Sequence, residues 1–232
     1  MTISRRAAIV CVAALLATPA FSDDLPPYLT AKQVDLTIML PPPPAAGSAL
    51  EKSEMAVVID AQKNASAERI KLASHDVEET IFAMFTGTLG PKFAPESFPK
   101  AAAFFDRVLK SEESVTDPAK KLFGRVRPYI ANPDIKALVK PSASGSYPSG
   151  HTTRVTVAAI VLVAMLPERR DQIWARANEY AESRVVGGMH YPADLDAGHR
   201  AGTAMGAVLF ADPAFRADFE VAKAEVRNAL GL

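Results

Sequence analysis

The chain has 232 residues, 49% of them apolar, with 26 basic and 26 acidic side chains. This length suits one domain with a substantial core, and the apolar content excludes general disorder. The balanced charge excludes an electrostatic basis for binding nucleic acid or an anionic membrane surface. A neutral chain with a locally cationic pocket suits a small anionic ligand better.

The first 22 residues have the pattern of an export signal. Two arginines precede an apolar stretch from Ala7 to Ala17, and Ala20-Phe21-Ser22 supplies small residues for cleavage before Asp23. The stretch is shorter than the roughly 20 apolar residues that a membrane-spanning helix requires. We therefore expect a signal peptide over residues 1–22 and a periplasmic mature protein. The only cysteine, Cys11, lies in this segment, so we expect no disulfide or cysteine metal site in the mature chain.

Residues 23–48 are rich in proline. Pro26-Pro27 and the run Pro41-Pro42-Pro43-Pro44 do not suit a helix interior and favour an extended course. We expect an arm that packs along the surface of the remaining chain, residues 49–232. A proline-rich ligand for a partner protein is the alternative interpretation of the four prolines.

The rest of the chain has helical patterns, with apolar residues three and four positions apart. No alternating pattern of useful length indicates a strand, and no internal repeat is found. The stretch from His151 to Leu166 is apolar nearly all round, which predicts a central buried helix. We expect an all-α, single-domain helical bundle with helices over residues 51–65, 67–86 and 98–109, one starting at Asp117-Pro118, and others over 151–166, 172–186, 192–210 and 213–230.

The segment Gly145-Ser146-Tyr147-Pro148-Ser149-Gly150-His151-Thr152 leads into the central helix. Ser149 can cap this helix, and Gly150 permits an unusual backbone angle. The first amides of a helix have no intrahelical partner and carry partial positive charge, so they form an anion site. His151 would stand beside the anion, placed to donate a proton. An ordinary helix cap followed by an exposed histidine is the alternative.

A second cluster follows the next predicted helix. Arg184 falls in the last turn of that helix, Gly187-Gly188 breaks the chain, and His190 lies in the gap before the helix that Pro192 starts. Asp194, one turn beyond His190, could accept a hydrogen bond from one ring nitrogen and leave the other as a nucleophile. The alternative is that Asp194 only caps the helix and that His190 is a loop residue.

Lys120 and Arg127-Pro128 form the third cluster. A lysine acts as a point charge, and an arginine can hold two phosphate oxygens at once. Taken singly, either would fit a solvated surface charge, which is the role that we expect for Lys121 and Arg125. Together the three clusters supply cations, free amides, two imidazoles and an orienting carboxylate, which suit the binding and transfer of a phosphoryl group.

The three clusters, in this order, resemble the signature of the type 2 phosphatidic acid phosphatase superfamily. The octapeptide Gly145–Thr152 is similar to that of the bacterial class A non-specific acid phosphatases, and the whole resemblance covers roughly Lys120 to Asp194. It implies the helical fold of the vanadium haloperoxidases and acid phosphatases. It also implies an exported phosphomonoesterase of broad specificity, without metal or cofactor, acting on nucleotides, sugar phosphates and aryl phosphates. Phosphotransfer to alcohols is an expected side reaction, and a homo-oligomer is compatible with the sequence.

The resemblance also implies a role for each motif residue. His190 would attack phosphorus and form a phosphohistidine, and Asp194 would orient it. His151 would protonate the leaving alcohol and then activate the water that breaks the intermediate. Five residues would bind the phosphoryl oxygens: Lys120, Arg127, Ser149, Gly150 and Arg184.

Other functions stay open at this stage. A vanadium-dependent haloperoxidase would have a similar site, although the chain is short for one. A lipid or polyprenyl (pyro)phosphate phosphatase is disfavoured because the mature chain has no expected membrane span, and a non-catalytic phosphate-binding protein needs no histidine–aspartate pair.

A metal site formed by His190, Asp194 and His199 is also conceivable. We disfavour it, because Asp194 and His199 would point to different faces of one helix. His75, in an acidic stretch, and Asp196 fit surface positions.

Overall fold

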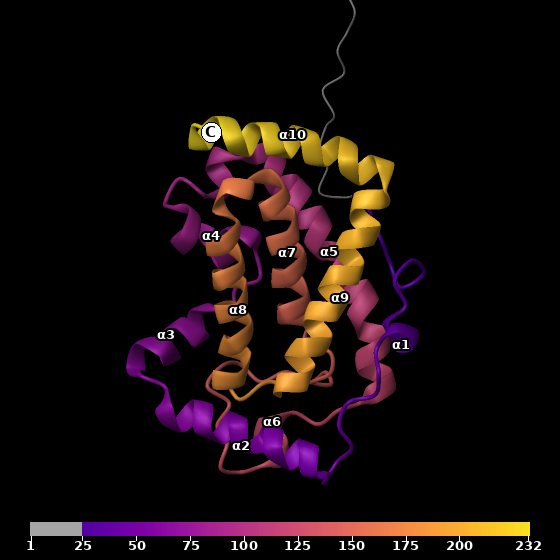
Figure 1. Cartoon of the computed structure of the whole chain (residues 1–232), viewed down its shortest axis with the longest axis vertical. Coiled ribbons are helices and arrows are strands. Elements are labelled where there is room, and N and C mark those ends of the chain that lie inside the picture. Colours follow the sequence, from indigo (N-terminus) through magenta and orange to yellow (C-terminus); the bar gives the residue numbers. More distant parts are fainter. Residues whose placement is uncertain (1–24) are drawn as a thin grey trace, which may run out of the picture.

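The computed structural model describes residues 25–232, so the predicted signal peptide and Cys11 lie outside the described residues. Within residues 25–232 every regular element is a helix, which confirms the prediction of an all-α bundle (Figure 1). The α-helices are α1 Leu36–Met39, α2 Ala49–Asn64, α3 Ala67–His75, α4 Ile81–Leu89, α5 Pro99–Phe123, α6 Pro128–Ala131, α7 Gly150–Met165, α8 Arg170–Val186, α9 Pro192–Ala211 and α10 Pro213–Leu230, with short 3₁₀ turns η1 Pro95–Ser97 and η2 Pro167–Arg169.

Helix α7 is the central buried helix that the sequence predicts. It packs against α5, α8 and α9, while α10 crosses one end of the bundle and α2 crosses the other (Figure 1). Close packing of α7 on α9 depends on glycine. A β-carbon on Gly198 would lie 2.7 Å from the β-carbon of Thr152. One on Gly202 would lie 2.6 Å from that of Thr156, so the N-terminal halves of both helices meet at a distance that only glycine allows.

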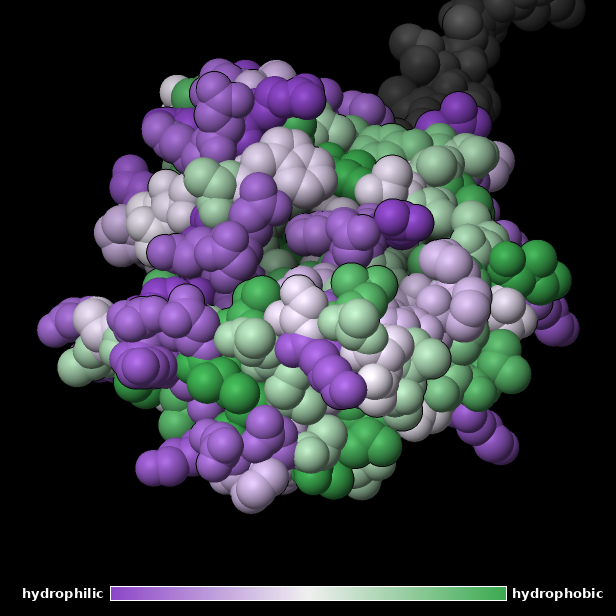
Figure 2. Space-filling model, turned by 60° about the horizontal axis from the view of Figure 1, so that its bottom comes forward, coloured by the Kyte–Doolittle hydropathy of each residue, from purple (hydrophilic) through white to green (hydrophobic). Residues whose placement is uncertain are grey.

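No helix within residues 25–232 has the length and apolar character needed to cross a membrane. Figure 2 brings the lower end of the bundle forward and shows hydrophilic and apolar side chains interspersed over that end. This mixture agrees with the balanced charge of the chain.

The proline-rich segment packs on the bundle as an arm from residue 25 onward. Tyr28, Leu29, Leu36 and Leu40 are buried in the main hydrophobic core. The four prolines run beside Tyr147, whose hydroxyl donates a hydrogen bond to the carbonyl oxygen of Pro41 at 2.8 Å. The arm is therefore tied to the segment that leads into α7.

The structure corrects the helix expected over residues 67–86, which is two helices. Helix α3 ends at His75, and α4 begins after Thr80, whose side chain accepts a hydrogen bond from the amide of Ala83. The break between them is stabilised by Asp76, which is 1% exposed and accepts hydrogen bonds from Arg176 and Ser183 of α8. These long-range contacts override the local helical pattern.

The prediction of a helix start at Asp117-Pro118 is wrong. Helix α5 begins at Pro99 and continues through Pro118 to Phe123. Val115 and Ala119 extend its buried face, whereas Pro118 lies on the exposed side. Proline costs a helix interior about 3 kcal/mol, and continued burial of one face offsets that cost here. Lys120 consequently lies in the last turn of a long helix.

Candidate active site

A cavity of about 580 Å³ opens at the lower end of the bundle, where α5 and α8 end and α7 begins. It brings together residues from all three sequence clusters. Ser149 and Asp194 are not part of its wall and are completely buried beside it. The predicted residues that line the cavity are Lys120, Arg127, Gly150, His151, Arg184 and His190.

A tight turn carries the chain from Arg184 to His190. The amides of Met189 and His190 donate hydrogen bonds to the carbonyl oxygen of Arg184 at 3.0 and 3.3 Å. Gly188 has φ +73°, and a β-carbon there would lie 2.4 Å from the carbonyl oxygen of Lys136. This turn therefore requires glycine and returns His190 to the same cavity as Arg184.

The contacts of His190 define its tautomer. Nε2 lies 3.1 Å from Nη1 of Arg127, and Nδ1 lies 3.3 Å from Oδ2 of Asp194. Because a guanidinium only donates, Nε2 must be the acceptor, so Nδ1 carries the proton and donates a hydrogen bond to Asp194. Nε2 thus keeps its lone pair on the cavity side. This is the arrangement expected of an oriented nucleophile.

Asp194 has a second structural role, because its Oδ2 also accepts a hydrogen bond from the amide of Tyr191 at 2.9 Å and caps α9. Its other oxygen, Oδ1, forms an ion pair with Arg125 at 2.6 Å. Burial raises the pKa of Asp194 to about 6, an increase that the charge of Arg125 opposes. The capping and orienting interpretations of Asp194 are therefore compatible.

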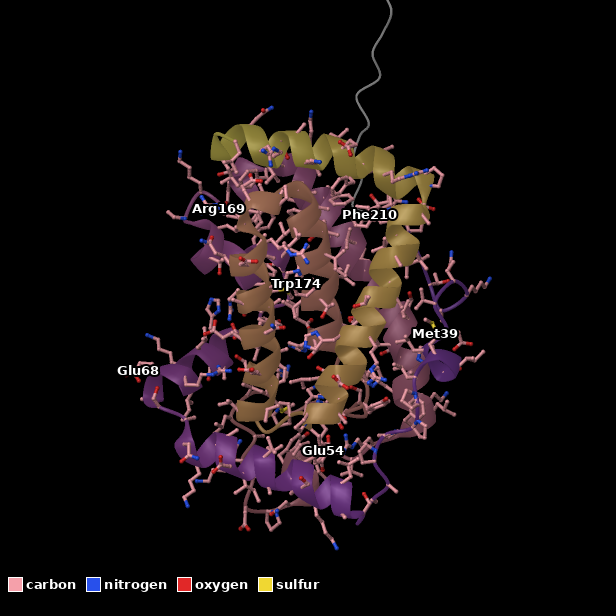
Figure 3. All side chains as sticks on the ribbon, viewed as in Figure 1. Met39, Glu54, Glu68, Arg169, Trp174 and Phe210 are labelled. Carbon is pink, nitrogen blue, oxygen red and sulfur yellow. The ribbon has the colours of Figure 1, made fainter. Side chains whose placement is uncertain are left out.

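Arg125 is not the solvated surface charge that the sequence suggests. Its side chain is 4% exposed and bridges Asp194 and Glu54 of α2, with both ion pairs at 2.6 Å. Its guanidinium carbon also lies 3.9 Å from the centroid of the Tyr191 ring. Glu54, which lies beneath the lower end of α9 in Figure 3, in turn accepts a hydrogen bond from the amide of Ala193 at 2.6 Å. By contrast, Lys121 is exposed as expected.

The start of α7 has the cap that the sequence predicts. Oγ of Ser149 accepts a hydrogen bond from the amide of Thr152 at 3.3 Å and another from the Thr152 hydroxyl at 2.9 Å. A β-carbon on Gly150 would lie 3.0 Å from Nζ of Lys120 and 2.8 Å from Oε1 of Glu112. The absence of a side chain on Gly150 leaves its backbone exposed to the cavity beside the lysine.

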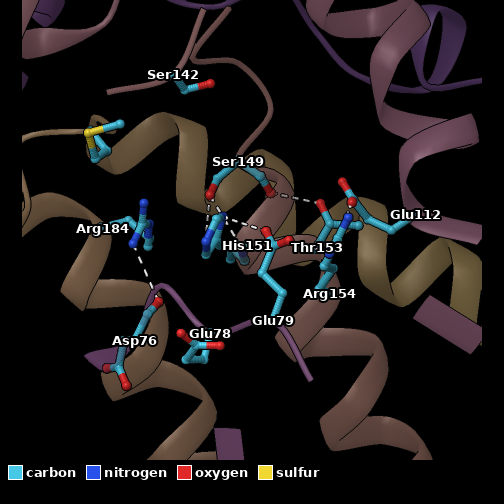
Figure 4. A network of polar contacts seen from close by, with 12 residues as sticks. Asp76, Glu78, Glu79, Glu112, Ser142, Ser149, His151, Thr153, Arg154 and Arg184 are labelled. Atoms are coloured by element: carbon cyan, nitrogen blue, oxygen red, sulfur yellow. Dashed lines mark hydrogen bonds and ion pairs between the residues drawn. The ribbon is translucent and has the colours of Figure 1, made fainter. Parts of the chain in front are cut away.

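His151 lines the same cavity and has its own carboxylate partner. Its Nδ1 is 3.2 Å from Oε1 of Glu79, while Nε2 is buried with no hydrogen-bond partner (Figure 4). Burial, followed by the positive charge of Arg184, lowers the pKa of His151 well below its ordinary value. The neutral form of His151 is therefore favoured.

No motif of the sequence indicates the groups that surround Glu79. Arg154 of α7 forms ion pairs with Oε2 of Glu79 at 2.5 Å, with Glu112 at 2.7 Å and with Glu113 at 2.9 Å. The acidic stretch after α3 had the features of a surface segment, and the side chain of His75 is indeed 60% exposed. Only the fold brings Glu79 to α7, so no spacing rule could have identified it.

Three cations face the cavity without a carboxylate partner. Lys120, Arg127 and Arg184 form no ion pair with a carboxylate of residues 25–232, and Nε of Arg184 is buried with no hydrogen-bond partner. Burial lowers the pKa of all three, and the pKa of His190 falls through burial and then through the charge of Arg127. Such uncompensated charge favours a bound anion.

Within residues 25–232, no group of three or more histidine, cysteine, aspartate or glutamate side chains is arranged to hold a metal ion. Nδ1 of His199 lies 2.9 Å from the hydroxyl of Thr156, and His199 lines a different cavity from His190. The side chain of Asp196 is 71% exposed and pairs with Arg200. These contacts agree with the positions expected for His199 and Asp196.

Residues 108–217 match the model of the PAP2 superfamily. A non-specific acid phosphatase of Providencia stuartii is 29% identical over 94% of this chain and 96% of that protein. A non-specific acid phosphatase of Salmonella typhi is 29% identical over 85% of this chain and 82% of that protein. A bacterial vanadium-dependent iodoperoxidase has a similar fold, with a TM-score of 0.56 and 22% identity over 74% of this chain and 52% of that one.

Proposed function

The chain belongs to the PAP2 superfamily, and on this basis we propose that it is an exported acid phosphatase that hydrolyses small phosphate monoesters through a phosphohistidine. One observation carries the proposal. Two histidines from distant segments line one cavity together with three cations that form no ion pair with a carboxylate of residues 25–232. The resemblance to non-specific acid phosphatases over most of the chain supports the same reaction class.

Substrate binding begins with the phosphoryl group. Lys120, Arg127 and Arg184 would hold its oxygens, together with the amide of Gly150. In the empty cavity Arg127 donates to Nε2 of His190. A bound phosphate would draw this guanidinium onto its own oxygens and expose the lone pair of Nε2 to phosphorus. Ser149, completely buried beside the cavity, would hold the helix start in place, and its hydroxyl would donate a hydrogen bond to a phosphoryl oxygen.

In the first chemical step, the lone pair of His190 Nε2 attacks phosphorus and the bond to the ester oxygen breaks. Asp194 holds the Nδ1 proton and stabilises the positive charge that forms on the ring. His151 gives a proton to the departing oxygen, so the alcohol leaves neutral. The negative charge of the bound phosphate raises the pKa of His151, which makes this proton available.

In the second step, water takes the place of the alcohol. His151 now accepts a proton from the water as its oxygen bonds to phosphorus, and the bond from phosphorus to Nε2 breaks. Inorganic phosphate and free His190 result. An alcohol that occupies the water position would receive the phosphoryl group, which accounts for the proposed phosphotransferase side reaction.

Broad specificity and metal independence are part of the proposal. The cavity of about 580 Å³ extends well beyond a phosphate group and leaves room for different alcohols. Fixed cations would neutralise charge in the transition state, the role that magnesium has in other phosphoryl transfer enzymes. The export signal expected in residues 1–22 supports a periplasmic location.

The experiment is a phosphate-release assay with the mature chain. The substrates would be p-nitrophenyl phosphate, nucleotides, sugar phosphates, pyrophosphate and a micellar lipid phosphate, each with and without a chelator. We expect release from several soluble monoesters, no effect of the chelator and inhibition by vanadate. Iodide and bromide oxidation with vanadate and peroxide would be measured in parallel. Halide oxidation without phosphate release, or release from the lipid alone, would overturn the proposal.

A further inference from the structure

Glu79 is the carboxylate that touches His151, and no sequence motif contains it. It lies between α3 and α4, where the chain leaves its expected helical course. Its Oε1 is 3.2 Å from Nδ1 of His151, and its Oε2 is 2.5 Å from Nη1 of Arg154. Glu79 also lines the cavity, so its carboxylate sits beside the reacting groups (Figure 4).

The position of Glu79 is fixed from several sides. The carbonyl oxygen of the preceding residue, Glu78, accepts a hydrogen bond from the hydroxyl of Tyr180 at 2.8 Å, and the following residue, Thr80, caps α4. The ring of Tyr180 also stacks on His151, with the centroids 6.1 Å apart at an angle of 21°. Imidazole and carboxylate are therefore held against one another by the same part of α8.

The neighbouring carboxylates are not placed to do the same. Glu112 uses Oε1 to accept from the hydroxyl of Thr116 at 2.6 Å and Oε2 to accept from Arg154 at 2.7 Å. Glu113 binds Arg154 as well and has a side chain that is 72% exposed. Among residues 25–232, Glu79 is the one carboxylate within 4 Å of a ring nitrogen of His151.

We propose that Glu79 is a positioning residue for His151: its carboxylate accepts a hydrogen bond from Nδ1–H, aims Nε2 at the leaving oxygen and stabilises the imidazolium that donates the proton. The inference rests on the proposed function, because it assigns His151 a proton transfer. Nε2 of His151 is buried and has no hydrogen-bond partner among residues 25–232, as expected of an atom that contacts a substrate oxygen. Without Glu79 the ring could turn or adopt the other tautomer, and either change would misdirect the proton.

A leaving-group series separates this role from a structural one. A general acid matters most when the departing alcohol is a poor leaving group, and least when the departing phenolate is stable without a proton. We would measure kcat/KM for methyl, phenyl, p-nitrophenyl and 2,4-dinitrophenyl phosphate, because this constant covers the steps up to departure of the alcohol. The variants are Glu79→Ala, Glu79→Gln and His151→Asn. Glu113→Gln is the matched control, since it removes a carboxylate from the same Arg154 without touching His151.

We expect Glu79→Ala to lower kcat/KM roughly 10- to 100-fold for methyl phosphate and only about 2- to 3-fold for 2,4-dinitrophenyl phosphate. Glu79→Gln, which keeps an acceptor oxygen, should fall between Glu79→Ala and the wild type. Glu113→Gln should change all four substrates by one common factor. The double variant that carries Glu79→Ala and His151→Asn should have about the same kcat/KM as His151→Asn alone, because both changes remove the same proton transfer.

Two outcomes would overturn the inference and are distinguishable. If His151→Asn steepens the leaving-group dependence and Glu79→Ala lowers all substrates equally, Glu79 has only a structural role and the proposed function stands. If neither variant steepens the dependence, His151 does not donate the proton, and the mechanism under the proposed function fails with the role of Glu79.

Discussion

The two histidines of the cavity are each held by a carboxylate that is itself held by an arginine, but the two assemblies differ in their surroundings. His190 and Asp194 are 2% and 0% exposed, and Arg125 pairs with Asp194. In the same cavity, His151 and Glu79 have side chains that are 21% and 38% exposed, and Arg154 pairs with Glu79. The same arrangement of histidine, carboxylate and arginine therefore occurs twice. The buried assembly is His190, Asp194 and Arg125, and the exposed assembly is His151, Glu79 and Arg154.

This difference suits the two proposed roles. A nucleophile must keep one tautomer and stay unprotonated, which complete burial and a fixed partner favour. A group that first donates and then accepts a proton must change charge in every cycle. Partial exposure of Glu79 and Arg154 lowers the cost of that change, because solvent can reach the pair.

The first way to test the comparison is to remove each nucleophile candidate in turn. His190→Ala should lower kcat on p-nitrophenyl phosphate by on the order of 10⁴ or more, because it removes the proposed nucleophile. Phosphate affinity, measured by calorimetry, should persist because Lys120, Arg127 and Arg184 remain. If His190→Ala retained turnover and His151→Ala lost it, His151 would be the nucleophile and the proposed assignment would be wrong.

The second prediction concerns the buried assembly of His190, Asp194 and Arg125. Arg125→Ala leaves Asp194 and Glu54 buried without their cation, so it should lower the free energy of unfolding by about 3–5 kcal/mol. Chemical denaturation measures this change. Arg200→Ala is the control, since it breaks an exposed pair with Asp196 on the same helix as Asp194 and should cost about 0.5 kcal/mol or less. Equal effects would show that the Arg125 network does not stabilise the fold.

The third prediction follows from the lowered pKa values of both histidines. Sulfate stays a dianion as the pH falls from 7.5 to 5, and its charge raises the pKa of a neighbouring imidazole. Binding therefore takes up protons, and sulfate affinity should increase as the pH falls, by up to about tenfold per pH unit for each proton. In His151→Asn the slope should be smaller, with the remainder due to His190 and Asp194. An affinity independent of pH would show that binding takes up no proton, which would contradict the proposed rise of the histidine pKa values beside a bound anion.

The fourth prediction concerns the exposed assembly of His151, Glu79 and Arg154. Arg154→Ala should lower the free energy of unfolding by about 2 kcal/mol, less than Arg125→Ala, because water can replace the cation at Glu79 and Glu113 and only Glu112 is left buried without it. The free energies of unfolding of Arg154→Ala and Arg125→Ala would be measured by the same chemical denaturation experiment. A loss as large as that of Arg125→Ala would show that solvent does not reach the His151 side as the exposures indicate.

The sequence predicted the parts of the site that depend on local geometry. His190 and Asp194 are one helical turn apart, and Ser149 caps the helix that His151 opens, so spacing alone brought these groups together. The helix boundaries followed where apolar spacing and capping agreed, as in α10. Local rules failed where burial prevailed, as at Pro118, whose helix continues because its other face is covered.

The missed residues share a different physical cause. Arg125 and Glu79 both contact residues that are far away in the sequence. Arg125 pairs with Glu54 and Asp194. Glu79 contacts His151 and Arg154. A single sequence carries no signal for such pairings. From the sequence alone, both residues therefore have the features of surface residues. The fold places Glu79 at the cavity and Arg125 against the buried carboxylate of Asp194.

The most direct measurement of the central claim is the site of phosphorylation in the His151→Asn variant. The variant would be mixed rapidly with p-nitrophenyl phosphate and quenched in alkali, which preserves phosphohistidine, and its peptides analysed by mass spectrometry. We predict a phosphoryl group on His190 that accumulates beyond the wild-type level, because no base activates the water that should remove it. A phosphoryl group on another residue, or steady turnover by the wild type with no phosphoenzyme, would contradict the proposed division of labour between the two histidines.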